Sequence, residues 1–172
     1  MEHTQAVIFD LEGVLIDNRS RLKYALLKVG AQSIGELSYP KKGVFWRIFL
    51  DRDLASQLDK VNRLGIRVLA ERMDKSIIIV SGSPCTIVRD HIEKIKACSK
   101  ELGIPIRIDE VYCRKKTRKK APDMKEEVVK SILARGVEVV EAHDDDERVL
   151  ARLKKYGIKC ILWRDLRPIG TL

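Results

Sequence analysis

The stretch AVIFDLEG, residues 6–13, decides the fold, because it joins four apolar residues to an acidic loop that contains a glycine. Four consecutive apolar residues are too hydrophobic for a strand with one solvated face, so the run predicts a buried parallel strand. In open sheets of parallel strands, ligands bind beyond the carboxyl ends of the strands. Asp10 and Glu12 are therefore expected at the edge of the sheet where a ligand binds.

Further apolar runs, bounded by turn residues, predict more buried strands. They cover residues 77–80, 106–111, 137–142 and 158–163. The segments between them have the apolar spacing of helices. These segments cover residues 88–102, 124–132 and 149–156. Strand and helix thus alternate, which predicts an α/β fold built on a Rossmann-like, doubly wound parallel sheet.

Residues 18–74 interrupt this alternation, because two or three helical pieces precede the second core strand. We expect residues 1–172 to form a single domain in which residues 18–74 are a small helical insertion or cap. Such an insertion is a candidate lid over the carboxyl edge of the sheet. Plain helical packing around the core is the alternative.

Composition narrows the class of protein. Charged residues make up 34% of the chain, and Gln and Asn together number five, which favours a globular protein from a thermophile. The four cysteines, at positions 85, 98, 113 and 160, are spaced singly, so we expect reduced thiols and neither a zinc site nor a redox motif. Without an apolar run of membrane-spanning length or a signal peptide pattern, a soluble, cytoplasmic protein is expected.

Positive charge is concentrated in one place. Six of the 34 Lys and Arg residues lie in the stretch RKKTRKK, residues 114–120, and the formal net charge of +9 falls to +3 without them. A local basic patch attracts polyanions through counterion release, which suggests nucleic acid as a partner for residues 114–120. A solvated loop without a partner is the equally weighted alternative.

The acidic loop after the first strand holds two carboxylates two residues apart, Asp10 and Glu12. One carboxylate can attack phosphorus to form an acyl phosphate, and the second can protonate the leaving oxygen and then deprotonate water. Taken alone, an Asp at the end of a strand is more often a helix cap or a loop anchor.

Two further strand ends carry groups that suit a phosphate ester. Ser81 and Gly82 follow the second strand at a helix start, where a hydroxyl and backbone N–H groups suit phosphate oxygens. The run DDDE, residues 144–147, offers hard oxygen ligands for magnesium. The alternatives are an ordinary helix cap at Ser81 and a solvated N-cap in the acidic run.

In this order the residues resemble the haloacid dehalogenase-like phosphohydrolases, which carry D-x-[DE]-G, a Ser, a helix-borne Lys and an Asp pair. The second half is most similar to the 3′-phosphatase domain of phage-type polynucleotide kinase, because RK, KEE, DD and a Gly-Ile-Lys-Cys strand follow in the same order. On that alignment Lys125 is the phosphate-binding lysine, and Lys120 is the fallback. A solvated lysine at a helix end is the alternative.

The resemblance implies a phosphatase in which Asp10 is the nucleophile and Glu12 transfers the proton. It implies that Mg²⁺ is the cofactor and that the phosphoryl group binds to Ser81, Gly82 and the lysine. The implied metal ligands are Asp10, the Glu12 carbonyl, Asp144 and Asp145, with a register uncertain by one within the acidic run.

Two departures from the family pattern leave two functions open. Glu12 stands where Asp is usual, although enolase-phosphatase-like members also carry D-x-E-G, and Ser83-Pro84 stands where polynucleotide phosphatases have an Arg. We expect an enzyme that hydrolyses a phosphate monoester, such as a nucleic-acid 3′ end or a nucleotide. The alternative is a catalytically weak member that binds nucleic acid or protein.

Overall fold

The computed structural model describes residues 4–116 and 118–172. The strands of the main sheet are β1 (Gln5–Phe9), β4 (Ser76–Pro84), β5 (Glu110–Arg114), β6 (Glu138–Asp144), β7 (Lys159–Arg164) and β8 (Arg167–Thr171). The α-helices are α1 (Arg19–Val29), α2 (Lys41–Phe49), α3 (Arg52–Leu58), α4 (Arg63–Ala70), α5 (Cys85–Leu102), α6 (Ala121–Ala134) and α7 (Glu147–Leu153). Two short 3₁₀ turns, η1 (Ile34–Glu36) and η2 (Lys154–Tyr156), and a separate ladder of β2 (Ile16–Asp17) and β3 (Lys60–Val61) complete the described chain.

The main sheet has the strand order β5-β4-β1-β6-β7-β8. The strands from β5 to β7 pair in parallel, and β8 pairs antiparallel with β7. The chain crosses from β1 to β4 and returns to β6 on the other side of β1, so the sheet is doubly wound. The predicted α/β fold class is confirmed.

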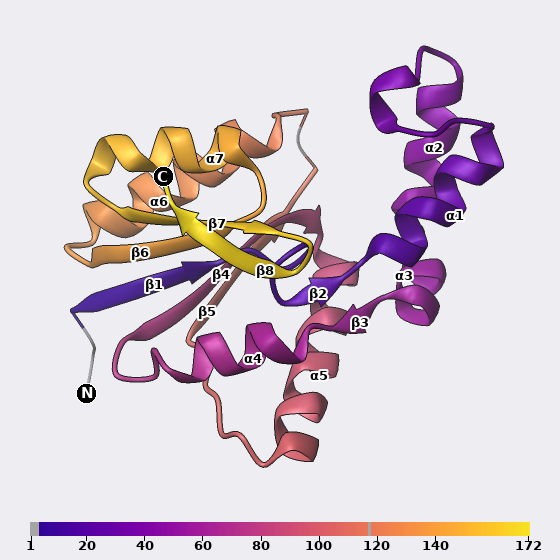
Figure 1. Ribbon diagram of the computed structural model, residues 1–172. Coiled ribbons are helices and arrows are strands. Elements are labelled where there is room, and N and C mark those ends of the chain that lie inside the picture. Colours follow the sequence, from indigo (N-terminus) through magenta and orange to yellow (C-terminus); the bar gives the residue numbers. More distant parts are fainter. Residues whose placement is uncertain (1–3, 117) are drawn as a thin grey trace.

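Helices cover both faces of this sheet (Figure 1). Successive residues of a strand face opposite sides, so Ala6 and Ile8 pack with α6 and α7, whereas Val7 and Phe9 pack with α4 and α5. Burial on both faces explains why the run is continuously apolar. In the parts of the chain that the structure describes, no helix combines the length and the apolar character needed to cross a membrane.

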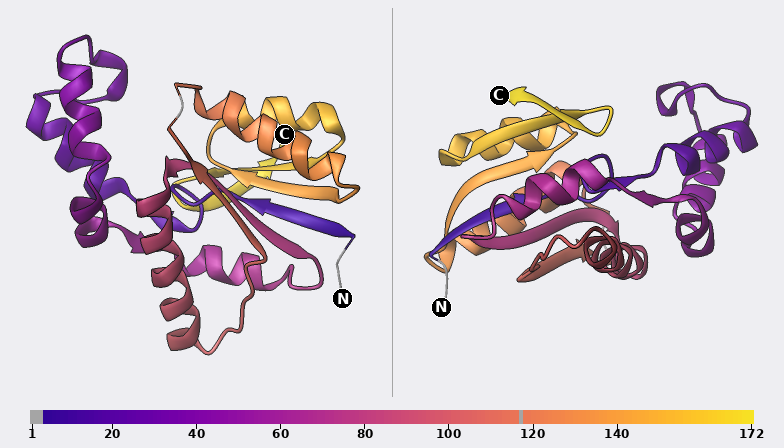
Figure 2. Two further views of the ribbon diagram at one scale, coloured as in Figure 1. Left: turned by 180° about the vertical axis from the view of Figure 1, so that it is seen from behind. Right: turned by 60° about the horizontal axis from the view of Figure 1, so that its bottom comes forward.

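The helices α1, α2 and α3 form a helical unit that stands beside the carboxyl ends of the sheet strands (Figures 1 and 2). They bury an apolar cluster of their own, which includes Ala25, Phe45 and Phe49. The short strands β2 and β3 lead from the sheet to this unit and back. In contrast, α4 packs on the sheet through Ile66 and Leu69.

The strand β5 begins at Glu110, later than the predicted start at residue 106. The carboxylate of Asp109 accepts a hydrogen bond from the backbone N–H of Ile77 at 2.8 Å, and thereby takes the place of a strand carbonyl. Ile106 and Ile108 still pack against the core, which explains why their pattern resembles a strand.

The strand β8 has no counterpart among the strands predicted from the sequence. This edge strand is exposed along its whole length, so it has no apolar run to mark it. The turn before it uses Asp165 and Leu166 at φ of 47° and 61°, where a glycine would have signalled a turn.

Cys85 and Cys113 form a disulfide, so the expectation of reduced thiols is wrong for these two residues. The register of β4 and β5 places Pro84 opposite Arg114, and the two cysteines stand beside this pair. The two cysteines are 28 residues apart in the sequence, and the parallel pairing of β4 with β5 brings them together. Their spacing alone therefore does not indicate the disulfide. The other two cysteines are free thiols, as expected.

Candidate active site

Three neighbouring strands bring polar residues to one edge of the sheet. Asp10 follows β1, Ser81 lies in β4 and Asp144 ends β6, and β1 stands between the other two strands. All three residues are buried. They line a cleft of about 950 Å³, together with residues of the loop after β1, the helical unit, the segment that leads from β5 into α6, and the acidic run with the start of α7. Parallel topology thus assembles one site from three distant segments.

Lys125 lies at the centre of this site with its ammonium group buried. Its Nζ lies 2.9 Å from Asp10 Oδ1 and 2.6 Å from Asp144 Oδ2. Lys120, the fallback candidate, is the exposed residue that precedes α6, and it lines the cleft without reaching this pair. The structure therefore brings Lys125 into contact with the predicted nucleophile.

Negative charge exceeds positive charge at the site. Burial and the nearby Asp144 carboxylate raise the pKa of Asp10 well above its usual value, against the effect of Lys125. Burial and Asp144 also raise the pKa of Asp145 to about 6. Although burial disfavours its charged form, the carboxylates of Asp10 and Asp144 raise the pKa of Lys125. The Lys125 ammonium group is thus the one cation among the three carboxylates described in this paragraph. A further cation would relieve the repulsion between these carboxylates.

The acidic run after β6 is divided between two tasks. Asp10, Asp144 and Asp145 each offer a carboxylate oxygen within 4.8 Å of the others, a spacing that suits a metal ion. Asp146 instead caps α7, because its carboxylate accepts a hydrogen bond from the backbone N–H of Arg148 at 2.9 Å. The helix-cap interpretation of the acidic run therefore applies to Asp146.

Gly13 lets the loop after β1 approach the acidic run of the site. Gly13 has a φ of +87°, and a Cβ at this position would overlap the Asp145 carboxylate. Gly82 follows Ser81, whose hydroxyl accepts a hydrogen bond from the backbone N–H of Ser83 at 3.1 Å. Both Ser81 and Gly82 line the cleft. The end of β4 thus forms part of the cleft lining.

The Glu12 carboxylate contacts the helical unit and the end of β4. Its Oε1 accepts hydrogen bonds from Arg21 Nη2 at 2.5 Å and from Ser83 Oγ at 2.8 Å. Its Oε2 accepts one from Asn18 Nδ2 at 3.2 Å. The sequence analysis missed Arg21, because an arginine on a short helix normally faces solvent.

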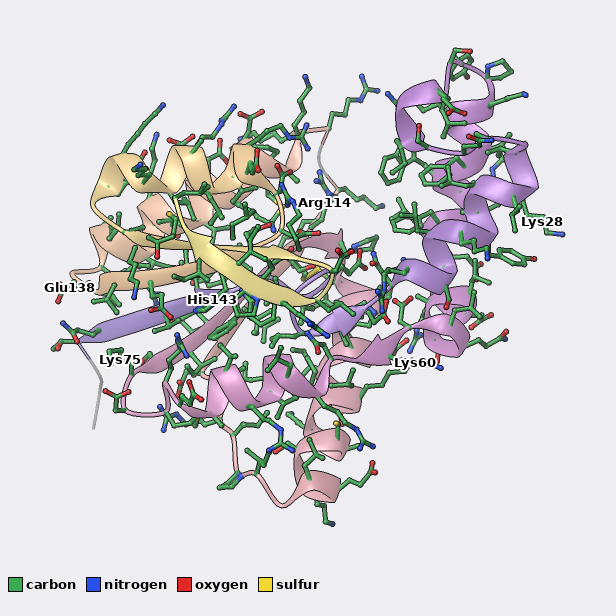
Figure 3. All side chains as sticks on the ribbon, in the orientation of Figure 1. Lys28, Lys60, Lys75, Arg114, Glu138 and His143 are labelled. Atoms are coloured by element: carbon green, nitrogen blue, oxygen red, sulfur yellow. A yellow bond between two sulfur atoms is a disulfide. The ribbon has the colours of Figure 1, made fainter. Side chains whose placement is uncertain are left out.

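His143 is packed and is not placed as a base (Figure 3). Its ring stacks on Phe9 with 4.3 Å between ring centres, and its Nδ1 accepts a hydrogen bond from Trp163 Nε1 at 3.0 Å. Its Nε2 therefore carries the proton and donates to Glu141 Oε1 at 2.5 Å. Burial lowers the pKa of His143, so the ring is neutral.

The cleft lies between a basic wall and a more apolar wall. The basic wall consists of Arg114, Arg118, Lys119 and Lys120, and the apolar wall includes Ile34, Trp46, Phe49 and Leu50, with Lys42 beside them. Arg114 lies between the sheet and the helical unit, where its Nε donates a hydrogen bond to the Gly82 carbonyl at 2.6 Å (Figure 3). Thr117, within the predicted basic patch, lies outside the described residues.

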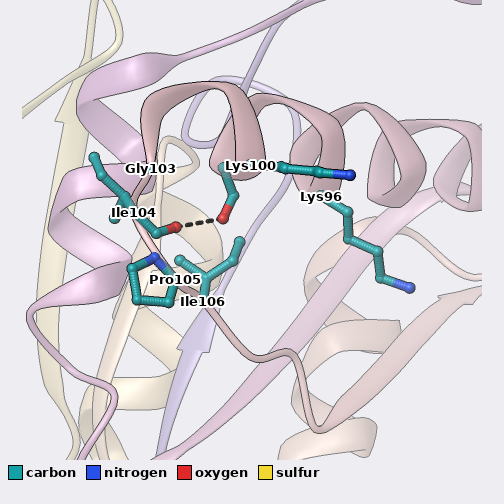
Figure 4. A pocket seen from close by; sticks show the side chains of 7 residues that line it. Lys96, Lys100, Gly103, Ile104, Pro105 and Ile106 are labelled. Atoms are coloured by element: carbon teal, nitrogen blue, oxygen red, sulfur yellow. Dashed lines mark hydrogen bonds between the residues drawn. The ribbon is translucent and has the colours of Figure 1, made fainter.

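A second hollow, of about 370 Å³, lies at the far end of α5 (Figure 4). It is lined by Lys96, Ser99, Lys100, Gly103, Ile104, Pro105 and Ile106. The Ser99 hydroxyl donates a hydrogen bond to the Ile104 carbonyl within it. Since α5 starts beside the cleft and rises 1.5 Å per residue, the hollow lies roughly 25 Å from the candidate active site. None of the predicted site residues lines it.

Comparison with known proteins finds similarity in structure. A scan against models of protein families finds no match, and a search of curated proteins finds no similar sequence. A haloacid dehalogenase-like family hydrolase from Streptococcus pneumoniae is 15% identical, with a TM-score of 0.62 over 91% of this chain and 83% of its own. CbbY from Rhodobacter sphaeroides, solved in complex with phosphate, is 14% identical, with a TM-score of 0.54 over 94% of this chain and 85% of its own.

A third similar structure belongs to the Pnkp1/Rnl/Hen1 complex. Its chain is 19% identical, with a TM-score of 0.58 over 93% of this chain and 46% of its own, so the likeness concerns about half of that chain. Another structure of these proteins is described as an RNA repair complex. Identities this low establish a shared fold. The chain has the haloacid dehalogenase-like fold.

Proposed function

We propose that this protein is a magnesium-dependent phosphatase that hydrolyses a phosphate monoester through an aspartyl phosphate on Asp10. The observation that carries the proposal is the buried ammonium group of Lys125 between the carboxylates of Asp10 and Asp144. A fixed positive charge beside a carboxylate nucleophile suits the transfer of a dianionic phosphoryl group. The haloacid dehalogenase-like fold supports the same chemistry.

The first half-reaction transfers the phosphoryl group to Asp10. A carboxylate oxygen of Asp10 attacks phosphorus, and the bond from phosphorus to the ester oxygen breaks. Glu12 gives its proton to that oxygen, so the alcohol leaves neutral. Lys125 and Ser81 bind the oxygens that do not react. Lys125 and the backbone N–H of Leu11, both 2.9 Å from Asp10 Oδ1, orient the nucleophile.

The second half-reaction releases inorganic phosphate. Glu12, now a carboxylate, takes a proton from a water molecule whose oxygen attacks phosphorus. The bond between phosphorus and Asp10 breaks, and the electron pair returns to the carboxylate. Glu12 ends protonated and Asp10 ends ionised, so both are ready for the next turnover.

The donor set at the sheet edge fits Mg²⁺. Asp10, Asp144 and Asp145 offer only hard oxygen ligands, and burial together with the Asp144 carboxylate raises the pKa of both Asp10 and Asp145. Asp10 and Asp145 would hold the ion, with the Glu12 carbonyl, and with Asp144 directly or through water. When bound, Mg²⁺ supplies positive charge to the phosphoryl oxygens.

We further propose that the substrate is a nucleic-acid 3′ end or a nucleotide. The basic wall, formed by Arg114 at the end of β5 and by the loop before α6, lines the cleft, where it can bind additional phosphates. Trp46, which is 37% exposed and lines the same cleft, offers a ring on which a base can stack. The structural likeness to a chain of an RNA repair complex supports this assignment.

The test is phosphate release from p-nitrophenyl phosphate and from a 3′-phosphorylated oligonucleotide, each with magnesium or with EDTA. We expect release from both substrates that requires magnesium and that Asp10→Asn abolishes. Asp17→Asn is the matched control, because Asp17 forms its ion pair with Arg19 on the neighbouring helix. No Asp10-dependent release from either substrate would reject the enzyme and favour the alternative, a catalytically weak fold member that binds nucleic acid or protein.

A further inference from the structure

Arg21 of α1 is a fully buried cation in contact with Glu12. Its Nη2 lies 2.5 Å from Glu12 Oε1, and its Nη1 donates a hydrogen bond to the Phe49 carbonyl at 2.6 Å. The guanidinium carbon also lies 4.3 Å from the centre of the Phe49 ring. Removing a charge from water is costly, so the partners of Arg21 must compensate for its burial.

Asp59 fixes the same guanidinium from the other side. Arg21 Nε lies 3.0 Å from Asp59 Oδ1, and Arg21 Nη2 lies 2.9 Å from Asp59 Oδ2, which makes a two-pronged ion pair. Asp59 Oδ2 lies 2.7 Å from Nε2 of His91, a buried residue of α5. Because α5 packs on the sheet and α1 belongs to the helical unit, a continuous chain of polar contacts links the two and ends on Glu12.

Glu12, Asp59 and His91 also have the spacing of a metal site, with ligand atoms within 4.8 Å of one another. Arg21 Nη2 lies within 3 Å of both carboxylates. The guanidinium thus supplies the positive charge that a metal ion would otherwise bring. The cluster is therefore a set of fixed hydrogen bonds around one arginine.

We infer that Arg21 is a positioning residue that holds the Glu12 carboxylate in place for proton transfer, an inference that rests on the proposed phosphatase function. Glu12 has one more rotatable bond than an Asp at the same position, so its carboxylate has more orientations to lose when it is fixed. Arg21, Ser83 and Asn18 together hold both of its oxygens. Of these three donors, Arg21 is the charged one, and its ion pair with Asp59 fixes the position of its guanidinium group.

The first test compares two phases of p-nitrophenol release in Arg21→Met. p-Nitrophenolate leaves without much protonation, so phosphorylation of Asp10 needs little help from Glu12, whereas hydrolysis of the aspartyl phosphate needs Glu12 as a base. We expect the initial burst to stay within about threefold of the wild-type rate and steady-state turnover to fall about 100-fold. An equal fall in both phases would overturn the inference, because it would report a general distortion of the site.

The second test repeats Arg21→Met in a Glu12→Gln background. If Arg21 acts through Glu12, its loss should change the steady-state rate of Glu12→Gln by no more than about threefold. A fall as large as in the wild-type background would contradict the inference. Arg21→Lys keeps the charge but lacks the planar fork that reaches Asp59 and Glu12 together, so we expect it to restore only part of the turnover.

Arg52→Met is the matched control. Arg52 of α3 forms a two-pronged ion pair with Asp90 of α5 at 2.8 and 2.9 Å, so it also joins the helical unit to α5, away from Glu12. We expect near-wild-type turnover from this variant. If Arg21→Met does not fold, Arg21→Lys is used for both measurements. An inactive wild type would reject the proposed function, whereas an active wild type with independent effects of Arg21 and Glu12 would reject only this inference.

Discussion

At the scale of single residues, the site depends on one buried positive charge among several negative ones. Lys125 is held by Asp10 and Asp144 together, and each contact is shorter than 3 Å. Removal of the ammonium group would leave two buried carboxylates facing each other. Lys120 carries the same charge at an exposed position of the same cleft, which makes the two lysines a natural pair for comparison.

We expect Lys125→Met to lower kcat about 1000-fold, because the phosphoryl group loses a fixed charge in a buried site. Lys120→Met should change kcat by less than about threefold, because an exposed charge is screened by solvent. It should raise KM, because Lys120 belongs to the basic wall of the cleft. Steady-state kinetics with p-nitrophenyl phosphate measures both values. Similar losses of kcat in the two variants would show that Lys125 has no special role.

Glu141 links the buried His143 ring to Arg72. Although burial opposes its charged form, the bonds from His143 and Arg72 lower the pKa of Glu141 to about 2, from its usual 4.5. A lowered pKa in the fold means stability that is present above about pH 4.5 and is lost as the pH falls towards 2. We therefore expect the free energy of unfolding of Glu141→Gln to be about 2 kcal/mol below that of the wild type at neutral pH. This difference should shrink below pH 4.5.

Urea unfolding at several pH values measures this difference. Glu138→Gln is the control, because Glu138 lies on the same strand but is exposed, and its carboxylate bonds only to the Gln5 side chain among the described contacts. A Glu141→Gln difference that stays constant from neutral pH to about pH 2 would contradict the assignment.

Residues that follow buried strands could be predicted from the sequence, because the signal and the site lie in the same short segment. Asp10, Ser81 and Asp144 each stand at the end of an apolar run, and all three line the cleft. Arg21 and Trp46 could not be predicted, since their positions depend on how the helical unit packs beside the sheet. No short sequence pattern near Arg21 or Trp46 indicates how the helical unit packs.

At the scale of elements, the pairing of β4 with β5 organises one side of the site. It places the disulfide between Cys85, which follows the end of β4, and Cys113, which precedes the basic wall. The bond therefore ties two cleft-lining segments together. The sequence located the apolar part of β4, residues 77–80, but neither its extension to Pro84 nor the start of β5 at Glu110. The contact between the cysteines depends on the pairing of these two segments.

We expect Cys113→Ser to lower the free energy of unfolding by about 3.5 kcal/mol, the value for a loop closed over 28 residues. For a chain of this size the melting temperature should fall by about 10 °C. Cys98→Ser is the control, because Cys98 is a free thiol on α5. Calorimetry measures both variants, and equal melting temperatures for Cys113→Ser and the wild type would contradict a stabilising disulfide.

At the scale of the whole molecule, binding of a metal ion couples the site to the stability of the fold. The pKa of Asp145 is about 6 in the fold, against a usual 3.8, so this carboxyl destabilises the metal-free protein at neutral pH. The sign of the shift means that this loss is relieved as the pH falls through about 6. Magnesium competes with the proton for the same carboxylate, so its stabilising effect should be largest at neutral pH.

Magnesium in about 100-fold excess over its Kd should add about 2.7 kcal/mol at neutral pH, which EDTA reverses. At about pH 5 the increase in melting temperature should be much smaller. Asp145→Asn should remove most of the effect, whereas Asp146→Asn should retain it, because Asp146 caps α7 and Asn is an equally good cap. A magnesium effect of the same size in both variants would argue against this metal site.

The proposed mechanism depends on a covalent intermediate on Asp10. The most direct measurement is mass spectrometry of the protein quenched in acid during turnover of p-nitrophenyl phosphate, with Glu12→Gln used to slow the hydrolysis of the intermediate. The proposed mechanism predicts that the peptide containing Asp10 gains the mass of one phosphoryl group, and that the same peptide of Asp10→Asn does not. Turnover without any phosphorylated Asp10, or a phosphoryl group on another residue, would contradict it.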